Sequence, residues 1–224
     1  MIITAIHQIE ITNFCNLKCP YCIHGTAGAM KRKMVFMSRG NWQNALTWVT
    51  HFIRAGTQGA LNLAGIGEST LHQDFVKMLG EAREVVGPER DIDLATNGTV
   101  LTQAMIDAIR PFRPRVWVSL HDPARAAKTV RALQEAGLFA QASLDGALNP
   151  NDWGGQVEWL KPNYRITCPW LTAGWGFVAA TGEILTCCLD ASLRSMVGHV
   201  SNGPCLLEVK PWELCKTCYQ DGPA

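Results

Sequence analysis

Residues 11–25, ITNFCNLKCPYCIHG, place three cysteines in the spacing C-x3-C-x2-C directly after the strand-like run Ala5–Thr12. The thiolates of Cys15, Cys19 and Cys22 can hold three corners of a cubane iron–sulfur cluster and leave the fourth iron without a protein ligand. A fourth cysteine would close such a cluster for electron transfer, whereas an open iron can bind a substrate or cofactor. Short cysteine runs also bind zinc, so the spacing alone leaves that alternative open. The stretch predicts a metal site with chemistry of its own.

Three further motifs follow, each directly after a short apolar run. They are the glycine-rich segment Gly65-Ile66-Gly67-Glu68, the sequence Thr96-Asn97-Gly98, and Ser119. In a parallel sheet, ligands gather at the carboxyl ends of the strands. We therefore expect these motifs and the cysteine loop to converge on one rim of a sheet.

In this order the motifs resemble the radical S-adenosylmethionine (SAM) superfamily, over residues up to about 160. Tyr21 fits the aromatic position before the family's third cysteine, and Ser69 stands where its GGEP segment has proline. The resemblance implies a SAM-binding [4Fe–4S] cluster, SAM, and an electron donor such as flavodoxin or ferredoxin. It also implies reductive cleavage of SAM to a 5′-deoxyadenosyl radical that takes hydrogen from an unactivated C–H bond.

Motif position also implies which residues contact each cofactor. Three thiolates would ligate the catalytic cluster, from Cys15, Cys19 and Cys22. The implied SAM-binding set is Tyr21, Gly65, Ile66, Gly67, Glu68, Asn97 and Ser119. In it, the glycine-rich backbone approaches the methionine amine, the glutamate buttresses that loop, and the tyrosine backbone lies near the adenine. The asparagine and serine face the ribose or methionine carboxylate, with strand-end caps as the alternative.

Polar residues after the fourth and fifth strands are candidates for proton transfer or substrate contact. They are His121, Ser143 and Asp145. Capping of the next helix is the alternative for His121.

Short apolar runs alternate with helical patterns along most of the chain. The expected strands are 5–12, 60–64, 91–95, 115–120, 139–144 and 157–160. Ser38 and Thr102 are expected to cap helices, and Pro123 to open one. Strands separated by helices argue for a parallel sheet with right-handed crossovers. We expect an α/β fold, a partial (β/α)6 TIM-like barrel over residues 1–163.

Residues 164–224 form a different, cysteine-rich region. It resembles the twitch extension, a shortened relative of the SPASM extension of some radical SAM enzymes. Gly182-Glu183 is expected at the tip of a hairpin between 176–180 and 184–186, with a further strand at 196–200. The resemblance implies one auxiliary [4Fe–4S] cluster with the ligands Cys168, Cys187, Cys215 and Cys218. A structural zinc is the alternative, and Cys188 and Cys205 are expected to be non-ligands.

Composition bounds the remaining possibilities. The chain has 224 residues, 47% of them hydrophobic and 17% charged, which is enough for a substantial core. A net charge of +1 does not support extended nucleic-acid binding. The tight basic run Lys31-Arg32-Lys33 is interpreted as a solvated loop, or alternatively as a contact to an acidic substrate. Without a signal sequence or an apolar run of about 18 residues, we expect a cytoplasmic protein with no membrane span.

Three reactions remain open for a small-molecule or nucleoside-like substrate. The first is two-electron oxidation of a small polar molecule, as in the small twitch dehydrogenases of aminoglycoside pathways. The second is a redox-neutral isomerisation or rearrangement, resembling the radical SAM isomerases of phage thymidine hypermodification, which act on a modified nucleobase. The third is peptide epimerisation or crosslinking. A non-catalytic metal-binding module would require all the motif matches to be accidental.

Overall fold

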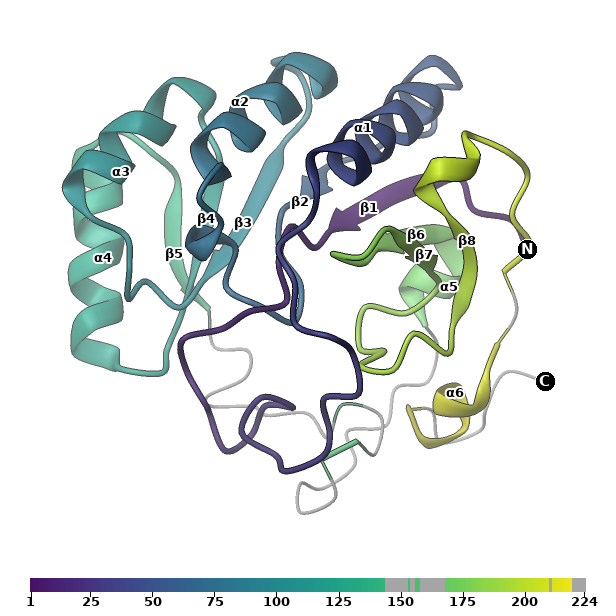
Figure 1. Ribbon diagram of the computed structural model, residues 1–224. Helices are drawn as coiled ribbons and strands as arrows, with labels where there is room; N and C mark the ends of the chain where they lie inside the picture. The colour runs from purple at the N-terminus through teal and green to yellow at the C-terminus, as the bar shows by residue number, and fades with distance from the viewer. Residues whose placement is uncertain (144–152, 154–155, 158–167, 210, 219–224) are drawn as a thin grey trace.

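The computed structural model describes residues 1–143, 153, 156–157, 168–209 and 211–218. Its central feature is an eight-stranded sheet in the order β5-β4-β3-β2-β1-β6-β7-β8 (Figure 1). The strands are β1 (Ala5–Ile9), β2 (Leu61–Asn62), β3 (Ile92–Thr96), β4 (Arg115–Ser119), β5 (Ala140–Ser143), β6 (Trp175–Val178), β7 (Glu183–Leu185) and β8 (Met196–His199). The first six strands pair in parallel, and β7 and β8 add antiparallel pairs. The expected α/β fold with a largely parallel sheet is confirmed.

Four helices connect the parallel strands and line one side of the sheet (Figure 1). They are α1 (Arg39–Arg54), α2 (Phe75–Val86), α3 (Gln103–Ile109) and α4 (Pro123–Glu135). The caps expected from the sequence are present: the Ser38 side chain accepts from the Asn41 N–H at 3.2 Å, and Thr102 accepts from the Met105 N–H at 3.3 Å. Pro123 occupies the first turn of α4, as expected.

The remaining helices are short. They are the 3-10 helices η1 (Ser69–Leu71), η2 (Arg110–Phe112) and η3 (Val200–Asn202), and the α-helices α5 (Pro169–Ala173) and α6 (Glu213–Cys218). Figure 1 shows α6 at the opposite end of the molecule from α3 and α4. Within the described ranges, no helix is both long and apolar enough to cross a membrane.

The main core lies between the sheet and its helices. Trp42 and Trp48 of α1 and Phe75 of α2 are fully buried there. Alternate side chains of β3 and β4 are buried, which is the pattern of strands with one face on a core. Each such large apolar side chain contributes about 1.5–3 kcal/mol by leaving water. The packed core holds the parallel strands in place, so that their carboxyl ends lie along one edge of the sheet.

The sixth parallel strand of the described sheet is β6, and most of the strand expected at 157–160 falls outside the described residues. Val157 lies in a bend, and 158–160 fall outside the described residues. β6, expected only as the first strand of the hairpin, pairs in parallel with β1, from Ala5 opposite Trp175 to Ile9 opposite Val178. The apolar strand β6 covers the edge of β1 that would otherwise be unpaired. The predicted hairpin and the strand after it are confirmed as β6, β7 and β8.

The proposed division at 163/164 falls outside the described residues. The strands from its C-terminal side extend the same sheet as β1 to β5. Gly182 turns the hairpin with a φ of 102°, a backbone conformation that favours glycine.

Candidate functional site

The carboxyl ends of β1 to β4 surround a cavity of about 190 Å³. The loop after β1 supplies three thiols, the loop after β2 supplies the glycine-rich segment, and β3 and β4 end at the cavity. Of the predicted site residues, its lining contains Cys15, Cys19, Cys22, Tyr21, Gly65, Ile66, Gly67, Glu68, Asn97, Ser119 and His121. The structure therefore brings the sequence motifs together as the parallel-sheet argument predicts.

The three thiols of this loop lie close enough to affect one another's ionisation. Burial raises the pKa of Cys15, and the charges of Glu68 and Cys19 raise it further. Burial raises the pKa of Cys22 to about 11, with smaller contributions from Cys15 and Cys19. The raised pKa values of Cys15 and Cys22 favour their protonated forms, so metal loading would release those protons.

The donor set suits a cluster with several irons. Within the described ranges, no group of three or more His, Cys, Asp and Glu side chains is arranged to hold a single metal ion. A [4Fe–4S] cluster has a different requirement, because each cysteine thiolate binds its own iron.

Two glycines allow the loop after β2 to lie directly against the end of β1. A Cβ on Gly65 would lie 2.4 Å from the Glu10 Cγ, and one on Gly67 would lie 2.3 Å from the Thr12 carbonyl oxygen. No other residue fits at either position without displacing the loop. Ser69, which replaces the family's proline, donates its hydroxyl to the Leu63 carbonyl at 3.0 Å. The loop thus has a defined geometry without the proline.

Glu68 connects the glycine-rich loop to the end of β3. Its buried carboxylate accepts hydrogen bonds from the Thr70 N–H at 3.2 Å, the Thr96 hydroxyl at 2.8 Å and the Asn97 N–H at 2.6 Å. These contacts suit the buttressing role that the family resemblance implies for Glu68.

The Asn97 side chain makes its hydrogen bonds to other residues of the protein. Its amide nitrogen donates to the Asn16 side-chain oxygen at 2.9 Å and lies 3.9 Å from the Cys15 sulfur. Its amide oxygen accepts from the Thr99 N–H at 2.9 Å. Asn97 therefore ties the cysteine loop to the end of β3.

His121 and Tyr21 lie beside Cys19. The Tyr21 hydroxyl and the His121 Nδ1 form a hydrogen bond, and that Nδ1 lies 3.5 Å from the Cys19 sulfur. The two rings stack, with centroids 5.7 Å apart. Burial lowers the pKa of His121, which favours the neutral imidazole. The Tyr21 backbone oxygen accepts a hydrogen bond from the Trp153 indole at 3.3 Å.

The other two candidate catalytic residues, Ser143 and Asp145, lie at and just after the end of β5 in the sequence. Ser143 ends β5 directly opposite Ser119 in the strand register, so it lies on the same rim. Asp145 lies outside the described residues.

A second pocket brings the C-terminal cysteines together. Its lining includes Cys168, Cys187, Cys215 and Cys218. Burial raises the pKa of Cys187 well above its ordinary value, and the charges of Cys188, Cys218 and Cys215 add to this. Backbone N–H groups donate to two of the sulfurs, from Leu171 to Cys168 at 3.3 Å and from Trp212 to Cys215 at 3.5 Å.

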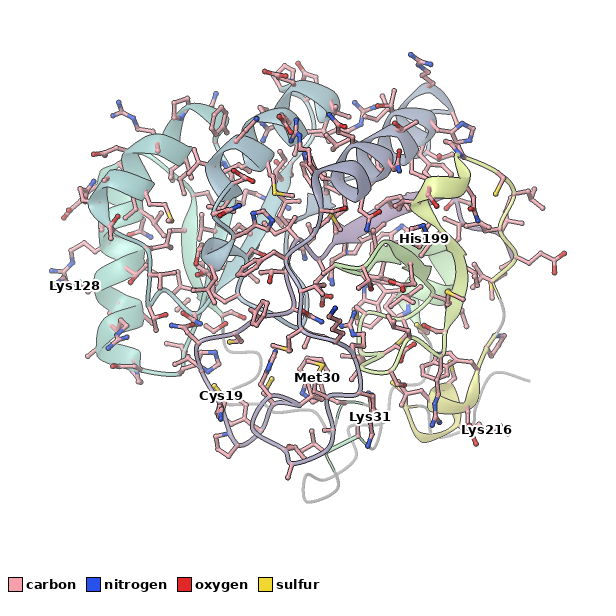
Figure 2. The ribbon with its side chains drawn as sticks, viewed as in Figure 1. Cys19, Met30, Lys31, Lys128, His199 and Lys216 are labelled. Atoms are coloured by element: carbon pink, nitrogen blue, oxygen red, sulfur yellow. The ribbon has the colours of Figure 1, made fainter. Side chains whose placement is uncertain are left out.

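The two remaining cysteines are placed differently. Cys188 packs beside a small apolar cluster that contains Phe177, and Cys205 is exposed. Figure 2 shows Lys216, a neighbour of Cys215 in α6, at the molecular surface close to this region.

An ion pair that the sequence analysis missed lies behind the first cavity. The solvated interpretation of Lys31-Arg32-Lys33 is wrong for Arg32, whose side chain is only 4% exposed, like that of its partner Glu10. The two Arg32 amino groups donate to the two Glu10 oxygens at 2.9 and 3.0 Å. Lys31 and Lys33 are exposed, and Lys31 reaches the surface of the cysteine-loop end of the molecule (Figure 2).

Glu10 also joins segments far apart in the sequence. Its oxygens accept from the Ile66 N–H at 2.8 Å and the Ala180 N–H at 3.2 Å. The pair thus links β1, the cysteine loop, the glycine-rich loop and the turn after β6. Its sequence signal is a glutamate between two isoleucines of an apolar run, Ile9 and Ile11.

Comparison with known proteins finds one matching family model and several solved structures of similar fold. A family model described as the Radical SAM superfamily matches residues 9–137. No curated protein sequence matches the chain. BtrN, solved in complex with AdoMet and 2-DOIA, has a TM-score of 0.71 and 17% identity, over 90% of this chain and 80% of that chain. Native anSMEcpe with bound AdoMet and Cp18Cys peptide has a TM-score of 0.62 and 13% identity, over 88% and 77%. At these identities the likeness concerns the fold alone.

Proposed function

The chain belongs to the radical SAM superfamily, and we propose that it reductively cleaves SAM and abstracts a hydrogen atom from a small polar substrate. One observation carries this proposal. Three cysteine thiols and the glycine-rich segment from a different strand end line the same cavity. Members of this superfamily are enzymes, so the geometry supports a catalytic role.

We propose that Cys15, Cys19 and Cys22 hold a [4Fe–4S] cluster, with SAM in the adjoining cavity. The donor chemistry fits, because three half-buried thiols line one cavity of about 190 Å³. When bound, cluster and SAM together supply the electron transfer and the radical chemistry.

The chain's own residues would orient SAM and hold the loops that surround it. Because Gly65 and Gly67 carry no side chain, their loop packs against the end of β1, and its backbone lines the cavity. Glu68 holds this loop on the β3 side and Glu10 on the β1 side. Such fixed positioning is the main contribution that a protein makes to cofactor chemistry.

The polar residues divide into two groups. Asn97 and His121 would act as positioning residues, because their side chains contact the cysteine loop. Ser119 and Ser143 end adjacent strands at the rim and remain candidates for contact with SAM or substrate. Asp145 keeps the same candidate role.

We propose a second [4Fe–4S] cluster at Cys168, Cys187, Cys215 and Cys218, within a twitch-like extension over residues 164–224. This second cluster is supported by a pocket that four cysteines line together with three leucines. Four protein ligands close a cluster and favour electron transfer over substrate ligation. A structural zinc is the alternative, and it would require the four thiols to move into a single-ion arrangement that the described residues do not show.

Dehydrogenation is our first choice of reaction. A second cluster could remove the second electron of a two-electron oxidation, and an electron donor such as flavodoxin or ferredoxin would reduce the first cluster. BtrN was solved with 2-DOIA and anSMEcpe with a peptide, so a related fold accommodates different substrates. Redox-neutral isomerisation, including that of a modified nucleobase, is the second choice. The close spacing of the cysteines favours metal ligation over disulfides, which is the pattern expected in a reducing compartment such as the cytoplasm.

The decisive experiment measures iron, sulfide and SAM cleavage under anaerobic conditions after dithionite reduction. We expect about eight irons per chain, for two four-iron clusters, together with 5′-deoxyadenosine. Replacing Cys15, Cys19 and Cys22 by alanine should abolish 5′-deoxyadenosine formation. Replacing the exposed Cys205 by alanine is the matched control and should change neither quantity.

The outcomes separate the parts of the proposal. Continued SAM cleavage by the triple variant would refute the assignment of the cluster ligands. About four irons with cleavage would remove the second cluster, and zinc without cleavage would overturn the enzyme proposal. With candidate substrates, a product lacking two hydrogens supports dehydrogenation, whereas an unchanged mass supports isomerisation.

A further inference from the structure

Thr186 places a buried hydroxyl at the four-cysteine pocket. It follows β7 directly and precedes Cys187, and the residue is 3% exposed. Its side chain belongs to the lining that it shares with Cys168, Cys187, Cys215 and Cys218. Among the residues that the structure describes, the Thr186 hydroxyl has no hydrogen-bond partner.

A buried hydroxyl without a partner is unfavourable and rare. Folded proteins pair the large majority of buried polar groups, and exceptions often mark a missing ligand or ion. The Thr186 main chain is held independently, because its N–H donates to the Ser195 carbonyl at 3.2 Å. The unpaired group is therefore the side-chain hydroxyl alone, in a residue that lines the same pocket as the four cysteines.

We infer that the Thr186 hydroxyl donates a hydrogen bond to a sulfur atom of the second cluster and tunes its reduction potential. This inference rests on the proposed second cluster. A donated hydrogen bond stabilises the extra negative charge of the reduced cluster, so it makes the potential more positive. Thr186 is thus a tuning residue that touches no substrate.

Two backbone donors act in the same direction. The N–H groups of Leu171 and Trp212 already donate to cysteine sulfurs, but a side-chain substitution cannot remove them. Thr186 contributes through its side chain, so its effect can be removed by mutation. Valine has nearly the same shape and volume as threonine and lacks the hydroxyl.

The test is an anaerobic redox titration of the second cluster, followed by electron paramagnetic resonance. It uses the background in which Cys15, Cys19 and Cys22 are alanine, so that only one cluster is observed. We expect Thr186→Val to shift the midpoint by about 59 mV to a more negative value, a tenfold change in the one-electron equilibrium. Thr186→Ser keeps the hydroxyl and should stay close to the parent value. Thr50→Val in α1, whose hydroxyl bonds to the Leu46 carbonyl, is the matched control.

The possible results are distinct. An unchanged midpoint in Thr186→Val refutes the hydrogen bond while the second cluster stands. An equal shift in Thr186→Val and Thr186→Ser also refutes it, because the shift would then arise from packing. Absence of the four irons from the parent background refutes the second cluster, and the inference with it.

Discussion

Glu10→Gln should destabilise the protein strongly, although the two side chains have almost the same shape. Arg32 donates to both Glu10 oxygens, and both side chains are 4% exposed. Neutralising Glu10 leaves the Arg32 guanidinium buried without a counter-charge. Removing one partner of a buried pair costs about 3–5 kcal/mol. That is a large share of the 5–15 kcal/mol, roughly, by which ordinary proteins are stable.

The assay is urea unfolding under anaerobic conditions, followed by circular dichroism. A slope of about 1–3 kcal/mol per molar urea converts this loss into a midpoint lowered by at least about 1 M. The matched control is Glu213→Gln, the same chemical change in an exposed pair, where Arg194 and Glu213 are 3.8 Å apart and the Glu213 side chain is 79% exposed. We expect the control to cost less than about 1 kcal/mol.

A double variant tests the cause. In Glu10→Gln with Arg32→Met, the uncompensated charge is gone, and the glutamine oxygen can still accept from the Ile66 or Ala180 N–H. We therefore expect the double variant to be more stable than Glu10→Gln alone, a positive coupling in the mutant cycle. A Glu10→Gln midpoint within experimental error of the Glu213→Gln midpoint would refute the reasoning. So would a double variant less stable than Glu10→Gln.

Two further predictions concern the same sheet. Gly65→Ala should lower both the melting temperature and the rate of SAM cleavage, because the added Cβ would lie 2.4 Å from the Glu10 Cγ. The control is Gly59→Ala, where the added Cβ has open space around it, and it should change neither quantity. Burial lowers the pKa of His7 from its ordinary 6.5, with Asp93 opposing in part, so the unfolded chain binds the proton more tightly than the folded protein. The stability of the folded protein should therefore fall as the pH is lowered through about 6.5. In thermal unfolding from pH 5 to 8, His7→Phe should remove this part of the pH dependence. A variant whose pH profile is identical to that of the parent protein would contradict the prediction.

Local patterns in the sequence predicted the helices and strand ends well. Ser38 and Thr102 cap their helices through side-chain hydrogen bonds within the same turn, so neighbouring residues determine them. The convergence of Cys15 and Ser119 on one cavity follows from a general property of parallel sheets. Such features need no knowledge of distant packing.

Features that depend on distant segments were missed. The hairpin strand β6 was predicted from the sequence, but its parallel pairing with β1 was not. The residues of a hairpin strand do not show whether its other edge also pairs in parallel with a distant strand. Arg32 looked like a solvated cation because its neighbours are lysines, while its partner Glu10 lies 22 positions away.

The pairing of β6 with β1 also has a consequence for protein engineering. β1 is an interior strand of the sheet, bonded to β2 on one side and β6 on the other. Cutting the chain just before Cys168 would strip β1 of one neighbour and expose its main-chain donors and acceptors along an apolar strand. Such an edge recruits strands from other molecules and leads to aggregation. The C-terminal region therefore shields the rest of the sheet from self-association.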